Sequence, residues 1–95
     1  MEPIEIPITD VLDLHYFRPK EVPGLLLDYF EECVAKEIFS VRVIHGKGRG
    51  ILKQKTLRCL KKNPFVVSHK PAPGDAGGWG ATLVFLKSPS QKDHA

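Results

Sequence analysis

The chain has 95 residues, a length that suits one small domain. It is 42% hydrophobic and 26% charged, which is ordinary for a globular protein in water. No stretch approaches the roughly 20 apolar residues of a membrane-spanning helix, and the acidic start lacks the apolar core of a signal peptide. We therefore expect a cytoplasmic protein without a membrane partner.

The net charge of +3 conceals a marked asymmetry along the chain. Residues 1–37 contain nine acids and three bases, whereas residues 38–74 contain no acid. The nine bases of that second segment are Arg42, Lys47, Arg49, Lys53, Lys55, Arg58, Lys61, Lys62 and Lys70. A long stretch of one sign favours a polyanionic partner, and nucleic acid is the leading candidate.

The first third of the chain predicts two strands and a helix. Isoleucines that alternate with polar residues or proline over 4–8 indicate a short edge strand, and 11–15 indicates a second strand. A helix is predicted from Pro19 to about Lys36, from apolar residues at helical spacing. Because Pro23-Gly24 weakens its first turns, its regular part is expected to begin after Pro19.

The remainder alternates between strands and a helix. A β-branched strand is predicted at 41–45, a basic helix at 51–60 that ends at Asn63-Pro64, and a strand at 65–69. A loop rich in proline and glycine follows, and the last strand is predicted at 80–86.

The resulting order, β-β-α-β-α-β-β, predicts an α/β fold. We expect a two-layer α/β sandwich in which two helices cover one face of a mixed, roughly four-stranded sheet. The predicted organisation is an N-terminal extension over 1–10, one domain over 11–87 and a polar tail over 88–95. Cys33 and Cys59 fall on the apolar sides of the predicted helices and are interpreted as buried thiols.

One edge of this sheet is the expected functional site. If the strands at 11–15 and 41–45 are parallel neighbours, their carboxyl ends meet there, and so do His15 and His45. Asp13 precedes His15 by two residues and shares its face on a strand. Asp13 would orient a histidine or bind a metal, or it would only tether the turn after the strand, and the sequence leaves these alternatives open.

The segment from Gly46 to Gly50 is a candidate phosphate-binding loop. Its glycines precede a helix, whose N-terminus favours an anion, and we assign phosphate or nucleic-acid contacts to Gly46, Lys47, Gly48, Arg49 and Lys53. The spacing matches neither a Walker loop nor the dinucleotide fingerprint, so no nucleotide cofactor is expected. A glycine-rich connection with solvated bases is the simpler alternative.

Together these residues suggest phosphodiester chemistry. One histidine would take a proton from a ribose hydroxyl while the other protonates the leaving oxygen. Alternatively, Asp13 and a histidine would hold a divalent metal ion that activates water, and no cofactor is certain. Trp79 would stack on an unpaired base or pin its loop against the core.

Three motifs in this order resemble the Smr (small MutS-related) domain. They are Leu12-Asp13-Leu14-His15, then Val41-Arg42-Val43-Ile44-His45-Gly46-Lys47-Gly48, then Gly77-Gly78-Trp79-Gly80. The resemblance runs from about Val11 to Leu86 and is typical of a stand-alone member. It implies an α/β sandwich similar to the C-terminal domain of translation initiation factor three.

The resemblance also implies nucleic-acid endonuclease activity, on DNA or RNA, and in some members ribosome binding. By motif, Asp13, His15 and His45 become the catalytic candidates. Tyr16 stands where many members have glycine. The leading hypothesis is therefore an endonuclease acting on RNA or structured DNA. Its rivals are a non-catalytic nucleic-acid or ribosome-binding module and a protein-interaction domain.

Overall fold

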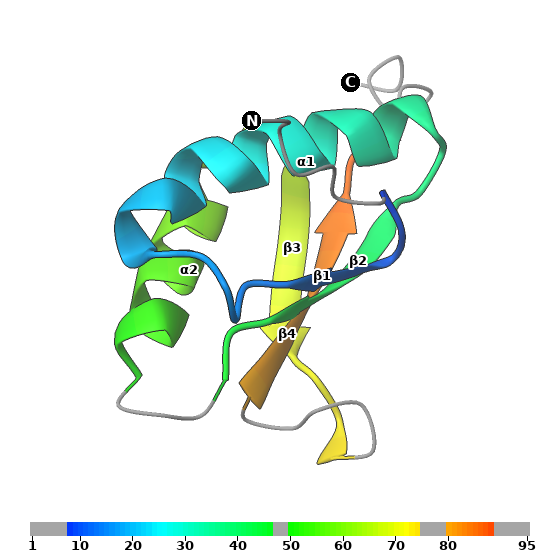
Figure 1. Cartoon of the computed structure of the whole chain (residues 1–95). Coiled ribbons are helices and arrows are strands. Elements are labelled where there is room, and N and C mark those ends of the chain that lie inside the picture. Colours follow the sequence, from blue (N-terminus) through cyan, green and yellow to red (C-terminus); the bar gives the residue numbers. More distant parts are fainter. Residues whose placement is uncertain (1–7, 47–49, 75–79, 89–95) are drawn as a thin grey trace.

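Two helices lie on one face of a four-stranded sheet in the computed structural model (Figure 1). The structure describes residues 8–46, 50–74 and 80–88. The elements are β1 (Val11–Asp13), the 3-10 turn η1 (Pro19–Glu21), α1 (Val22–Ala35), β2 (Ser40–Ile44), α2 (Ile51–Lys62), β3 (Val66–Pro71) and β4 (Ala81–Leu86). The predicted two-layer α/β sandwich is confirmed.

The sheet order is β1-β2-β4-β3, and its pairing determines where the functional loops lie. β1 runs parallel to β2, with Leu12 opposite Val43, whereas β4 runs antiparallel to β2 and β3. Beyond the last pair, the N–H of Leu14 donates to the carbonyl of Ile44 at 2.8 Å. The carboxyl ends of β1 and β2 therefore share one edge, as the sequence predicts, and the start of β4 lies at the same edge.

Several element boundaries differ from the predicted ones. The helix expected from Pro19 starts as the 3-10 turn, because Pro23 lies in the first turn of the regular helix. The strand expected over 11–15 ends at Asp13, where the chain turns. Of the edge strand expected over 4–8, only Ile8 is described, and it packs against the core without being part of a strand.

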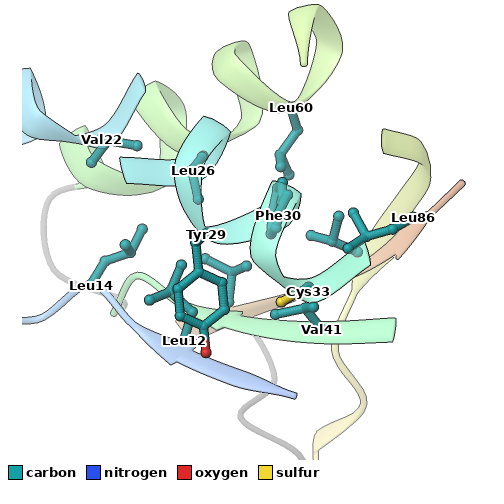
Figure 2. Packing of buried hydrophobic residues seen from close by; sticks show 12 residues of the cluster. Leu12, Leu14, Val22, Leu26, Tyr29, Phe30, Cys33, Val41, Leu60 and Leu86 are labelled. Carbon is teal, nitrogen blue, oxygen red and sulfur yellow. The ribbon is translucent and has the colours of Figure 1, made fainter. Parts of the chain in front are cut away.

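The core fills the space between the helices and the sheet (Figure 2). Alternate strand residues point toward the helices, and the helices contribute residues at helical spacing. The buried cluster contains Leu12, Leu14, Val22, Leu26, Tyr29, Phe30, Cys33, Val41, Val43, Leu60, Val84 and Leu86. The Tyr29 hydroxyl accepts a hydrogen bond from the N–H of Thr9 at 3.0 Å, which ties α1 to the start of β1.

The two cysteines differ in exposure. Cys33 is fully buried, whereas Cys59 is only partly buried, and both are free thiols. Burial, assisted by the negative charge of Glu32, raises the pKa of Cys33 to about 11. Cys33 is thus a structural thiol of the core. No helix within the described ranges has the length and apolar content that crossing a membrane requires.

Candidate active site

The turn after β1 is organised by Asp13. Its Oδ1 accepts a hydrogen bond from the backbone N–H of His15 at 2.8 Å, which is the geometry of an Asx turn. The tethering role that the sequence left open for Asp13 is thus present in the structure. A carboxylate can accept several hydrogen bonds, so this contact does not exhaust its acceptor capacity.

His15 and Tyr16 project from this turn into solvent. Both side chains are exposed, and Tyr16 keeps 87% of its surface accessible. Their rings meet edge to face, with centroids 5.6 Å apart. The turn therefore presents an imidazole and a phenol side by side, within reach of a macromolecular ligand.

His45, at the end of β2, has the opposite environment. Only 5% of its surface is accessible. Its Nδ1 lies 3.1 Å from the Gly46 carbonyl oxygen, and its Nε2 lies 2.9 Å from Thr82 Oγ1. Because a carbonyl can only accept, Nδ1 carries the proton, and Nε2 accepts the hydrogen bond of the Thr82 hydroxyl. Both ring nitrogens are thus engaged within the protein.

This environment favours the neutral imidazole. Desolvation by burial lowers the pKa of His45 below its ordinary value of 6.5; the Gly46 carbonyl opposes this effect and the positive charge of Lys53 reinforces it. A neutral, buried ring is a poor proton donor to a leaving group. The structure therefore gives His45 a different environment from that of the exposed His15, although both follow the same sheet edge.

The protein should become less stable as the pH decreases, because His45 is harder to protonate in the folded state than in the unfolded state. Below pH 6.5 the unfolded chain protonates this histidine, whereas the folded chain, with the lowered pKa, resists protonation until lower pH. The unfolded state then binds more protons, so the free energy of unfolding decreases as the pH drops below about 6.5.

Urea unfolding of the wild type and of His45→Gln at several pH values measures this effect. Below about pH 6.5 the wild type should lose more stability than the variant, because only the wild type has an imidazole at position 45. Parallel pH curves for the two proteins would contradict the assignment of a neutral buried imidazole.

Two glycines frame the loop between β2 and α2. Gly46 has φ of 81° and Gly50 has φ of 79°, in the left-handed region that favours glycine. The N–H groups of His45 and Gly46 both donate to the carbonyl of Gly80 at 2.9 Å, so the Gly46 amide is already engaged within the fold. Its observed role is to turn the chain and fasten the loop to β4.

The remaining site predictions divide between described and undescribed residues. Lys53 lies in the first turn of α2, close enough to His45 to affect its pKa. Lys47, Gly48, Arg49 and Trp79 lie outside the described residues. Within the described part of the chain, no three His, Cys, Asp or Glu side chains are grouped so that they could hold a metal ion.

Thr82 is a site residue that the sequence prediction missed. It is buried on β4, and its hydroxyl contacts the ring of His45. The alternation of β4 contains the signal, since Thr82 shares the helix-facing side with Val84 and Leu86. A hydroxyl on a buried strand face needs a polar partner, and the histidine at the end of the adjacent strand supplies it.

Comparison with known proteins identifies one family. The Smr domain model matches residues 12–87. A ribosome rescue factor SmrB from Vibrio vulnificus is 40% identical over 85 residues, which cover 88% of this chain and 48% of the relative. An endonuclease MutS2 from Solidesulfovibrio magneticus is 38% identical over 77 residues, which cover 81% of this chain and 10% of the relative. The chain thus spans about half of the first relative and a small part of the second.

Solved structures agree with the sequence match. The Smr domain of Thermus thermophilus MutS2 superposes with a TM-score of 0.77 at 32% identity, covering 83% of this chain and 99% of that one. YdaL, a stand-alone small MutS-related protein from Escherichia coli, gives the same TM-score at 26% identity, covering 86% of this chain and 67% of that one. Both the domain and a stand-alone protein therefore share this fold.

Proposed function

Because this chain belongs to the Smr domain family, we propose that it is an endonuclease that cleaves phosphodiester bonds in RNA, with structured DNA as the alternative substrate. The observation that carries the proposal is the exposed Asp13–His15 turn at the sheet edge that also holds the β2–α2 loop. A relative named endonuclease and another named ribosome rescue factor support a nucleic-acid substrate.

In this proposal His15 is the general base. Its exposed imidazole takes the proton of a ribose 2′-hydroxyl, the 2′-oxygen attacks phosphorus, and the bond to the 5′-oxygen breaks, with solvent returning a proton to that oxygen. Asp13 holds the His15 backbone in place through its hydrogen bond. Lys53 and the N-terminus of α2 favour the negative charge that grows on the phosphate.

We assign a positioning role to His45, in place of the acid–base role that the sequence suggested. Its ring joins Gly46 to Thr82, and thereby fixes the start of the loop that carries Lys47 and Arg49. Those two bases remain proposed phosphate ligands, with Gly48 as a conformational element and Trp79 as a stacking residue. Gly46 acts through its backbone conformation, since its amide bonds Gly80.

In the proposed cleavage no step needs a metal ion. Asp13 and His15 offer one carboxylate and one imidazole, so water and substrate phosphates would have to complete the coordination of a divalent ion. Within the described ranges no third ligand of the usual types completes such a set. A metal bridging Asp13 and substrate phosphates is the alternative that a chelator tests.

A non-catalytic ribosome or nucleic-acid binder is the second candidate. Two observations favour it: both nitrogens of His45 are occupied within the protein, and the exposed Tyr16 offers a ring to stack on a base. In that case the same edge would bind phosphates without cutting beside them.

Cleavage assays distinguish the candidates. Purified protein is incubated with labelled single-stranded RNA, duplex RNA, a 2′-deoxy version of the single strand, and supercoiled DNA, each with and without chelator. We expect cleavage of RNA but not of its 2′-deoxy version, unaffected by chelator. Loss of cleavage in chelator would support a metal route. Salt-sensitive binding without any cleavage would contradict the endonuclease and support the binding module.

A further inference from the structure

A groove lies between the helices, near the C-terminal end of α2. Its volume is about 400 Å³, enough for two or three side chains or one small ligand. The apolar part of its lining comes from Pro23 and Leu27, one turn apart on α1, and from Cys59 and Pro64. Leu27 is 44% exposed, so its side chain is open to a ligand in the groove.

Three bases of α2 border this apolar surface. Lys55, Arg58 and Lys62 all line the groove, and their spacing of three and four residues aligns them on one side of the helix. In the described part of the chain none of the three forms an ion pair. Three uncompensated cations beside an apolar surface favour a ligand that combines apolar side chains with negative charge.

We propose that this groove docks an acidic amphipathic segment of a partner protein. Its apolar side chains would enter between Leu27 and Cys59, while its carboxylates would pair with Lys55, Arg58 and Lys62. Among the residues that the structure describes, the lining contains no aromatic side chain. Unpaired bases bind chiefly by stacking on aromatic rings, so the lining suits the aliphatic face of a helix better than it suits unpaired RNA bases.

The groove is separate from the proposed active site. Lys55 of the groove follows Lys53 by only two residues, but at 3.6 residues per turn these two side chains lie about 200° apart around α2. Lys62 ends the helix about 13 Å beyond Lys53, at 1.5 Å per residue. In this proposal the basic helix serves two surfaces, with nucleic acid on the side of Lys53 and a protein on the side of Lys55, Arg58 and Lys62. A partner bound in the groove would leave the sheet edge open for a substrate.

Cys59 supplies a direct readout of occupancy. It lines the groove and is partly exposed, whereas Cys33 is fully buried, so a thiol-alkylating reagent should modify Cys59 first. The probe is a synthetic helix-forming peptide of about 14 residues with leucines on one face and glutamates on the other. At about ten times its dissociation constant, this peptide should slow alkylation of Cys59 about tenfold.

Matched variants test both parts of the recognition. The triple variant Lys55→Glu/Arg58→Glu/Lys62→Glu and, separately, Leu27→Asp should each abolish the protection. Lys61→Glu, a charge reversal on the same helix outside the groove lining, and Val67→Asp on β3 should preserve it. Circular dichroism confirms that each variant folds.

Two outcomes would overturn the proposal. Equal protection of the wild type and of the triple variant would remove the bases from recognition. Protection by single-stranded RNA at micromolar concentration, with none by the peptide, would assign the groove to nucleic acid. Neither outcome depends on cleavage, so the groove and the endonuclease proposal can fail independently.

Discussion

His15→Ala should reduce RNA cleavage by a factor of about 10² to 10⁴, the usual contribution of a positioned general base. The melting temperature should stay unchanged, because the His15 side chain is exposed and its only described contact beyond the backbone is the ring of Tyr16. Single-turnover cleavage of a labelled RNA measures the loss, and nitrocellulose filter binding checks that affinity for RNA is retained.

His69→Ala is the matched control for this variant. His69 lies on β3, outside the three motifs, so its replacement should leave the cleavage rate within about twofold, the scale of an ordinary substitution away from the site. Undiminished cleavage by His15→Ala would remove His15 from the chemistry. If His15→Ala also lost stability, the cause would lie in the turn rather than in proton transfer.

The sequence predicted the sheet edge because local patterns define it. The strands of Val41 and Leu12 are recognisable from apolar and β-branched residues, and a helix between two strands implies a parallel crossover. That logic is enough to bring Asp13, His15 and His45 to one edge, as the pairing of β1 with β2 confirms.

The difference in exposure between His15 and His45 could not be predicted from local patterns in the same way. Alternation along β2 places His45 on the side of Val41 and Val43, and so toward the helices. Whether that position is buried depends on the segments that pack around it, β4 among them. The partner hydroxyl of Thr82 comes from 37 residues further along the chain. Such a contact is fixed by tertiary packing, which one sequence does not define.

The groove between the helices could not be predicted from the sequence, for the same reason. Lys55, Arg58 and Lys62 are recognisable as a basic helix surface, but their neighbours Pro23 and Leu27 belong to another helix. The angle and separation of two helices follow from how their side chains interlock in the core. From its sequence alone, the basic helix α2 therefore looks like a single basic surface. In the fold, Lys55, Arg58 and Lys62 line the groove, whereas Lys53 lies close enough to His45 to affect its pKa.

Phe30→Ala should produce the largest loss of stability in this protein, about 3–5 kcal/mol. Phe30 is fully buried at 0% exposure, and it points from α1 into the cluster that Leu60 of α2 also enters (Figure 2). Truncation removes apolar surface from burial and leaves a cavity where the two helices and the sheet meet. Domains of this size have about 5–15 kcal/mol of stability in total, so a large share would be lost.

Urea unfolding followed by circular dichroism measures this loss, with the midpoint lowered and the slope unchanged. Leu27→Ala on the same helix is the control: its side chain is 44% exposed, so its truncation should cost less than about 1 kcal/mol. Equal losses in the two variants would mean that α1 does not pack as described. Because the same packing positions α2, which carries Lys53, Phe30→Ala should also weaken cleavage at temperatures where the fold remains intact, even though Phe30 touches no substrate.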